Sequence, residues 1–183
     1  MAKLHITVGP MFSGKTTFLL NKVESLLKNV SHDEILIINH QCDTRYSNNS
    51  ICSHDKKQMP SISLNKLNDI FDTIDITEIN KKKYIFIDEA QFFNDLYEVV
   101  KLLLETYKKT IYISGLDGDY KQEPFRESRF LDLIPYASTI QKLTALCVEC
   151  KEEAPFTKRI INSNEQICVG GSDSYNPVCL NHK

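Results

Sequence analysis

Short apolar runs alternate with amphipathic stretches along the chain up to residue 143. Crowded β-branched and apolar residues are typical of strands buried in a parallel sheet, and such runs occupy residues 4–8, 35–38, 84–87 and 110–114. Apolar side chains at helical spacing predict helices over 15–28 and 96–107. The pattern elsewhere predicts a long loop over 40–60, unassigned strand and helix pieces over 62–79, a polar loop over 117–128, a helical piece over 128–134 that precedes Pro135, and a last strand near 138–143.

This alternation predicts an α/β fold, in which helices flank a mostly parallel sheet. The pattern changes at Cys147, where helical periodicity stops and Cys, Gly, Ser and Asn become frequent. We therefore expect two units, an α/β domain over residues 1–146 and a small second domain over residues 147–183.

Composition and charge narrow the class of protein. The chain has 183 residues, of which 42% are hydrophobic and 25% charged, with a net charge of −2. These values suit a globular protein and give no electrostatic reason to expect a nucleic-acid or membrane surface. Neither a signal peptide nor a membrane-spanning run is evident, so we expect a cytoplasmic protein, working in the host cytoplasm if the source is viral. Six cysteines in that compartment are expected to be thiols or metal ligands.

The segment that follows the first predicted strand fits the motif G-x-x-x-x-G-K-[ST]. This segment, here called the phosphate loop, consists of Gly9, Pro10, Met11, Phe12, Ser13, Gly14, Lys15 and Thr16. Backbone N–H groups in such a loop point at phosphates, the lysine holds the β- and γ-phosphates, and the hydroxyl is a Mg²⁺ ligand. The alternative is a chance glycine-rich turn, which the flanking strand and helix disfavour.

Two carboxylates, Asp88 and Glu89, end the apolar run 84–87. An Asp at the carboxyl end of a strand near a phosphate loop is positioned to serve Mg²⁺. Glu89 is then positioned to accept a proton from the group that attacks the γ-phosphate. An attacking water would make the protein an ATPase, and a substrate hydroxyl would make it a kinase. Phe92 and Phe93 follow and either line a pocket or belong to the core.

Two short-spaced ligand pairs lie near the end of the chain. Cys147 and Cys150 form the first pair, and Cys179 and His182 form the second after 28 intervening residues. Tetrahedral zinc accepts three cysteines and one histidine, and a fully occupied set favours a structural site. Bound zinc would close the intervening residues into a loop whose glycines permit close approach to a ligand. The alternative is core cysteines beside an exposed histidine.

Seven segments together resemble the type II thymidine kinases of cells, bacteria and poxviruses. They are GPMFSGKTT (9–17), DTRYS (43–47), FIDEAQFF (86–93), LDGDYKQEPF (116–125), LTALCVEC (143–150), FTKR (156–159) and VGGSDSY (169–175). The resemblance implies a P-loop domain, and a zinc-anchored "lasso", residues 147–183, that covers the nucleoside. It implies transfer of the γ-phosphate from ATP to thymidine with Mg²⁺, in nucleotide salvage for DNA synthesis. It also implies a homotetramer and feedback inhibition by thymidine triphosphate.

The resemblance assigns roles to individual residues. It makes Glu89 the base that deprotonates the 5′-hydroxyl, and it assigns Asp43 and Arg45 to Mg²⁺ and the phosphates. The implied nucleoside-binding residues, with Phe92 from the motif, are Phe92, Leu116, Tyr120, Phe125, Thr157, Ile167, Cys168, Val169, Gly170 and Tyr175.

This sequence departs from the family pattern at two of these sites. His182 stands where relatives often have Cys, and Tyr120 stands where Phe is common. Two other functions stay open at this point: a P-loop ATPase or nucleic-acid-binding switch with a structural zinc module, and a kinase for another deoxynucleoside.

Overall fold

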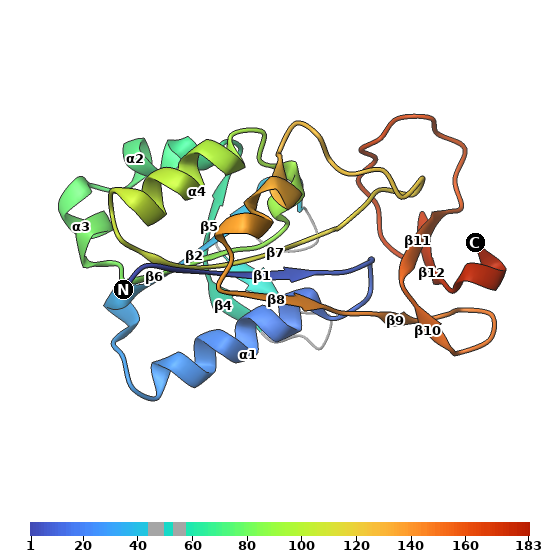
Figure 1. Ribbon diagram of the computed structural model, residues 1–183, viewed down its shortest axis with the longest axis horizontal. Helices are drawn as coiled ribbons and strands as arrows, with labels where there is room; N and C mark the ends of the chain where they lie inside the picture. Colours follow the sequence, from blue (N-terminus) through green and yellow to red (C-terminus); the bar gives the residue numbers. More distant parts are fainter. Residues whose placement is uncertain (44–49, 53–57) are drawn as a thin grey trace.

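A six-stranded sheet forms the centre of the computed structural model, which describes residues 1–43, 50–52 and 58–183. The strand order is β5-β2-β6-β7-β1-β8, and each pairing in this sheet is parallel (Figure 1). The strands are β1 (Lys3–Val8), β2 (Ile35–His40), β5 (Ile62–Leu64), β6 (Tyr84–Ile87), β7 (Thr110–Gly115) and β8 (Thr139–Lys142). The mostly parallel α/β sheet that the apolar runs predict is confirmed.

Helices cover both faces of this sheet. Helix α1 (Lys15–Leu27) lies on one face, and α2 (Ile70–Thr73), α3 (Ile76–Lys81) and α4 (Leu96–Glu105) lie on the other (Figure 1). Each face has its own buried apolar cluster, one of which includes Leu20 of α1 and Phe86, and the other Leu103 of α4 and Ile113. The inner strands β2 and β6 are buried on both sides, which explains why their sequences are apolar rather than alternating, whereas the edge strand β8 is exposed. No helix within the described part of the chain is long and apolar enough to span a membrane.

Two expectations for the connecting segments are wrong in part. The segment 40–60 contains an antiparallel pair, β3 (Ser50–Cys52) and β4 (Gln58–Pro60), rather than only loop. Strands of three residues are too short to show an alternating pattern in the sequence. The helical piece near Pro135 is a 3₁₀ helix, Phe130–Tyr136, that runs through the proline, and the Ala137 N–H donates to the Ile134 carbonyl beyond it.

Three of the remaining 3₁₀ turns fall in connections, and the fourth follows two small hairpins near the end of the chain. The turns are His32–Glu34, Leu67–Asp69, Ala90–Phe92 and Leu180–His182. In the hairpins β9 (Ala145–Leu146) pairs with β10 (Glu153–Ala154), and β11 (Phe156–Arg159) pairs with β12 (Tyr175–Val178). A separate small apolar cluster supports them, formed by Ala145, Cys147, Ala154, Val178 and Cys179. The division into two domains at residue 147 stays a prediction.

Candidate active site

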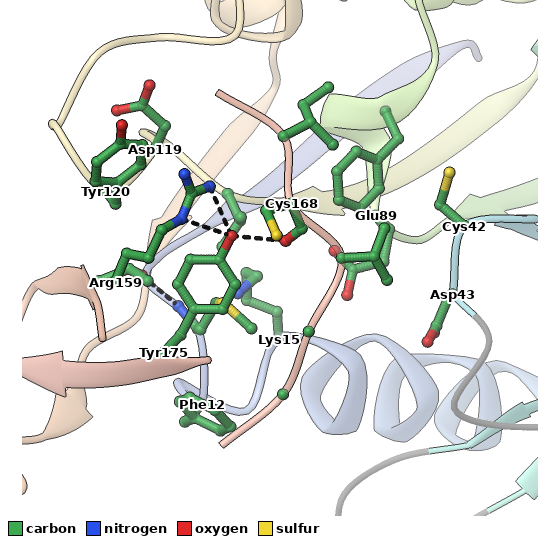
Figure 2. Close-up of a pocket in the computed structure, with 18 of the residues that line it drawn as sticks. Phe12, Lys15, Cys42, Asp43, Glu89, Asp119, Tyr120, Arg159, Cys168 and Tyr175 are labelled. Atoms are coloured by element: carbon green, nitrogen blue, oxygen red, sulfur yellow. Dashed lines mark hydrogen bonds between the residues drawn. The ribbon is translucent and has the colours of Figure 1, made fainter. Parts of the chain in front are cut away.

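A pocket of about 650 Å³ lies beyond the carboxyl ends of β1, β2, β6 and β7. Parallel α/β sheets bind their ligands at this edge, because the loops after neighbouring strands converge there. One wall comes from the phosphate loop and another from the lasso, so segments far apart in the sequence meet. Figure 2 shows Glu89, Asp43 and Cys42 on one side of the pocket, and Tyr120, Arg159 and Tyr175 on the other.

Most of the residues assigned from the sequence line this pocket. They are Met11, Phe12, Gly14, Lys15, Thr16, Asp43, Glu89, Phe92, Leu116, Tyr120, Phe125, Thr157, Ile167, Cys168, Val169, Gly170 and Tyr175. Four of the residues assigned to ATP or Mg²⁺ are not among its lining: Gly9, Pro10, Ser13 and Asp88. Arg45 lies outside the described residues.

The phosphate loop joins β1 to α1. Gly14 has φ +78°, a left-handed conformation that glycine adopts without strain, and it directly precedes the first turn of α1. Lys15 is only 8% exposed, and its Nζ donates to the Pro10 carbonyl at 2.7 Å. The Ser13 hydroxyl donates to the same carbonyl at 2.8 Å. The loop is therefore folded around its lysine, beside the N-terminus of a helix, where anions are favoured.

Asp88 connects the phosphate loop to the centre of the sheet. The Thr16 hydroxyl donates to Asp88 Oδ2 at 2.6 Å, and the Ser114 hydroxyl donates to Oδ1. Asp88 is 1% exposed, and burial, reinforced by the charge of Glu89, raises its pKa to about 6 despite these two donors and Lys15. A hydroxyl and a carboxylate held together suit Mg²⁺, which prefers oxygen ligands.

Glu89 lies on the pocket wall in an uncommon backbone conformation. Its φ of 51° and ψ of 41° are left-handed, which costs a residue with a side chain of this kind about 1 kcal/mol or more. The Gln91 amide Nε2 donates to Glu89 Oε2 at 2.7 Å. The carboxylate is therefore held by a hydrogen bond at the edge of the pocket.

Aromatic side chains form the next part of the pocket wall. The rings of Phe92 and Phe125 meet edge to face, with centroids 6.5 Å apart. Phe93 is fully buried, so the two neighbouring phenylalanines divide between pocket and core. Flat apolar walls of this kind suit a planar heterocyclic base.

The lasso contacts both the phosphate loop and the loop after β7. The Met11 N–H donates to the Thr157 hydroxyl oxygen at 2.9 Å. The Arg159 guanidinium lies 3.9 Å from the centroid of the Tyr120 ring and donates to the Tyr175 hydroxyl at 2.8 Å (Figure 2). That hydroxyl in turn donates to the Cys168 carbonyl at 2.6 Å.

The sequence alone did not predict a role for several of the residues that line the pocket. Arg159 stands within the FTKR segment, but its role depends on carbonyl groups of residues 163–166 that no spacing rule indicates. Gln166 donates to Asp119 Oδ2 at 3.0 Å and so joins the lasso to the loop after β7. Cys42 and Cys52 also line the pocket. No sequence signal identifies them, because a single cysteine has many roles.

The four metal-ligand candidates come together away from this pocket. The donor atoms of Cys147, Cys150, Cys179 and His182 all lie within 4.8 Å of one another. The Sγ atoms of Cys150 and Cys179 are 3.6 Å apart, and His182 Nδ1 lies 3.2 Å from Cys179 Sγ. Tetrahedral zinc with Zn–S bonds of ~2.3 Å separates its sulfur ligands by about 3.7 Å. The cluster can therefore hold zinc with little movement.

Comparison with known proteins identifies the family. The family model described as thymidine kinase matches residues 2–183. Over 97–98% of this chain, a thymidine kinase of Oryza sativa is 38% identical, the cytosolic thymidine kinase of Homo sapiens 36%, and a thymidine kinase of Myxoma virus 32%. The chain spans 65%, 71% and 93% of the lengths of these proteins, respectively. The chain belongs to the thymidine kinase family.

Proposed function

We propose that this protein transfers the γ-phosphate of ATP to the 5′-hydroxyl of thymidine, giving thymidine monophosphate and ADP. The observation that carries the proposal is one pocket that joins three parts: the phosphate loop, whose Thr16 is hydrogen-bonded to Asp88, the Glu89 carboxylate, and an aromatic wall under the lasso. Membership of the thymidine kinase family supports the same substrate. The proposal includes the P-loop type of nucleotide-binding fold, in which a strand, a phosphate loop and a helix follow one another.

The phosphate loop binds the triphosphate of ATP. Its backbone N–H groups and the N-terminus of α1 attract the phosphate oxygens. Lys15 exchanges its hydrogen bond with the Pro10 carbonyl for the β- and γ-phosphates. Magnesium, when bound with ATP, neutralises charge on the transferring phosphoryl group. Thr16 and Asp88 would hold it, with Asp43 at the pocket edge and Arg45 assisting the phosphates.

Glu89 deprotonates the nucleoside. As the 5′-oxygen of thymidine attacks the γ-phosphorus, its proton passes to the Glu89 carboxylate, and the bond from the γ-phosphorus to the oxygen bridging to the β-phosphate breaks, so that ADP leaves. Phosphoryl transfer depends mainly on positioning and charge neutralisation, so the base and the phosphate loop need a common rigid support. The carboxyl ends of β1, β6 and β7 provide it.

The lasso and the aromatic wall bind the thymine base. Phe92 and Phe125 offer flat faces, with Leu116 and Tyr120 beside them. Main-chain groups around Val169 and Gly170 lie across the pocket and supply polar contacts. A covering lasso also excludes water, which is the competing nucleophile. Structural zinc bound by Cys147, Cys150, Cys179 and His182 would anchor the lasso at its base.

The further properties of the family belong to the proposal as well. We infer a homotetramer that works in the cytosol in nucleotide salvage, with thymidine triphosphate as a feedback inhibitor and with residues 1–146 and 147–183 as its two domains. Neither a nucleic acid nor a membrane is a partner, in keeping with the small net charge of −2.

A panel of nucleosides tests the proposed substrate. ADP release from Mg-ATP should be slow until thymidine is added, and deoxycytidine, deoxyadenosine and deoxyguanosine should stimulate it far less. Stronger stimulation by another nucleoside would show that this nucleoside, and not thymidine, is the preferred substrate. Stimulation by DNA or RNA and not by thymidine would instead indicate a nucleic-acid-dependent ATPase.

A substitution at Glu89 tests the proposed base. Glu89→Gln should retain ATP binding and lose about 10²–10⁴ in turnover, the usual contribution of a general base. Unchanged turnover would remove Glu89 from that role.

A further inference from the structure

Gln91 connects the two functional halves of the pocket although it does not line the pocket. Its amide Nε2 donates to Glu89 Oε2 at 2.7 Å, and its Oε1 accepts from the Leu116 N–H at 2.9 Å. Leu116 follows β7 and belongs to the nucleoside wall, whereas Glu89 follows β6. One side chain therefore joins the proposed base to the wall against which the nucleoside packs.

The orientation of this amide is fixed by its two partners. A carboxylate can only accept a hydrogen bond and a backbone N–H can only donate one. A flipped amide would face the carboxylate with its oxygen and the N–H with its NH₂ group, so both contacts would become repulsive. Gln91 is 1% exposed, which leaves almost no access for water to replace either bond.

The absence of a side chain at Gly115 leaves space for the Gln91 amide in this orientation. A Cβ atom added at Gly115 would lie 2.6 Å from Gln91 Oε1 and 2.8 Å from Phe130 Cε1. A residue with a side chain at position 115 would therefore displace the amide. Glu89 itself has a left-handed backbone, and such conformations persist only where neighbouring contacts hold them.

We propose that Gln91 is a positioning residue for the Glu89 carboxylate, fixing it relative to the nucleoside wall at Leu116. The inference rests on the proposed function, in which Glu89 accepts the 5′-hydroxyl proton. Gln91 does not touch the reacting atoms, so its effect on the proton transfer passes through Glu89, whereas its bond to Leu116 supports the nucleoside wall. A base displaced by ~1 Å from its productive position costs a phosphotransfer enzyme up to about 10² in rate.

Two substitutions distinguish the hydrogen bond that Gln91 makes to Glu89 from the one that it makes to Leu116. Gln91→Glu keeps an oxygen that can accept from the Leu116 N–H but removes the donor to Glu89. Gln91→Met is similar in length and removes both bonds. If Gln91 only supports the wall at Leu116, Gln91→Glu should resemble wild type and Gln91→Met should be impaired. If it positions Glu89, both variants should lose activity.

The measurement is steady-state phosphorylation of thymidine as a function of pH, with thermal midpoints as the folding control. Burial and the charge of Glu89 raise the pKa of a carboxyl group introduced at position 91, so Gln91→Glu is compared with wild type at the alkaline end of the profile, where that group loses its proton. We expect kcat to fall about 10- to 100-fold in both variants while KM for thymidine and for ATP stays within about threefold. A normal kcat in Gln91→Glu, or a loss confined to KM, would overturn the inference. Should Gln91→Glu not fold, the same kcat-against-KM comparison with Gln91→Met decides.

A double-mutant cycle with Glu89→Gln gives the sharper test. In the proposal, the effect of Gln91 on kcat passes through the Glu89 carboxylate. Adding Gln91→Met to Glu89→Gln, in which this carboxylate is already absent, should therefore leave kcat within about twofold of Glu89→Gln alone. A further 10-fold loss would show independent effects and overturn the positioning role, while the low activity of Glu89→Gln would leave the proposed function intact. Wild-type activity in Glu89→Gln would overturn both.

Discussion

Replacing Arg159 by lysine should weaken thymidine binding about 10²-fold without weakening ATP binding. The Arg159 guanidinium donates to the carbonyls of Ser163 and Gln166, both at 3.1 Å, and to that of Glu165. It also donates to the Tyr175 hydroxyl from two nitrogens, at 2.8 and 3.2 Å. The planar group thus holds the lasso segment that crosses the pocket.

The magnitude follows from the contacts that lysine cannot make. A lysine ammonium is a compact point charge and cannot span three carbonyls and a hydroxyl, so two or three hydrogen bonds are lost at ~1 kcal/mol each. Loss of the guanidinium stack on Tyr120 removes about 0.5–1 kcal/mol more. Together about 3 kcal/mol is lost from the closed lasso. If thymidine binds under the lasso, as proposed, this loss raises KM for thymidine about 10²-fold.

The assay compares KM for thymidine and for ATP in Arg159→Lys and wild type. Hydrogen exchange of residues 160–174 should increase in the variant, since fewer bonds hold that segment. Arg126→Lys is the matched control, because it makes the same change at an exposed arginine outside the lasso, and its KM for thymidine should change less than about twofold. A KM for thymidine in Arg159→Lys within about twofold of wild type would refute the reasoning.

Three further perturbations test other parts of the site. His182→Cys should retain about one zinc per chain, whereas His182→Ala should lose metal and thymidine binding together. Metal analysis and binding titrations measure both properties. Metal-free His182→Ala that still binds thymidine would contradict the proposal that zinc anchors the lasso. Gly115→Ala should lower the free energy of unfolding by about 1–3 kcal/mol in urea and reduce kcat, because its Cβ would meet Gln91 and Phe130; wild-type values of both would contradict this. Burial raises the pKa of Asp88 to about 6. Without added Mg²⁺, the protonated carboxyl group of Asp88 therefore contributes its full stabilisation of the folded protein below pH ~4, and this stabilisation is lost as the pH rises through 6. Asp88→Asn should therefore flatten this pH dependence in urea unfolding, stabilise the ligand-free protein by up to about 3 kcal/mol at pH 7, and abolish turnover; an unchanged pH profile would refute the assignment.

Local sequence patterns were sufficient to predict the framework of the site. The apolar runs correspond to β1, β2, β6 and β7, and the phosphate-loop motif lies between β1 and α1. The two ligand pairs at Cys147 and Cys179 meet as their spacing predicts. Such features are readable because burial and turn geometry act on residues that are neighbours in the chain.

Other features were decided by contacts between distant segments. The β3–β4 pair was missed because each strand is only three residues long, and the Ser114 contact with Asp88 spans 26 residues. The same holds for Gln91, whose partner Leu116 lies 25 residues away, and for the stack of Arg159 on Tyr120.

The sequence by itself determined the α/β framework, the phosphate-loop motif, the paired carboxylates, the candidate metal ligands and the family. Only the tertiary structure decided which of these groups share a pocket, that Asp88 lies behind Thr16 rather than on the pocket surface, and that Gln91 is hydrogen-bonded to Glu89 and Arg159 to the lasso. The physical reason is that periodicity records each residue's own burial. A hydrogen-bond partner on a distant backbone depends instead on the path that the whole chain takes.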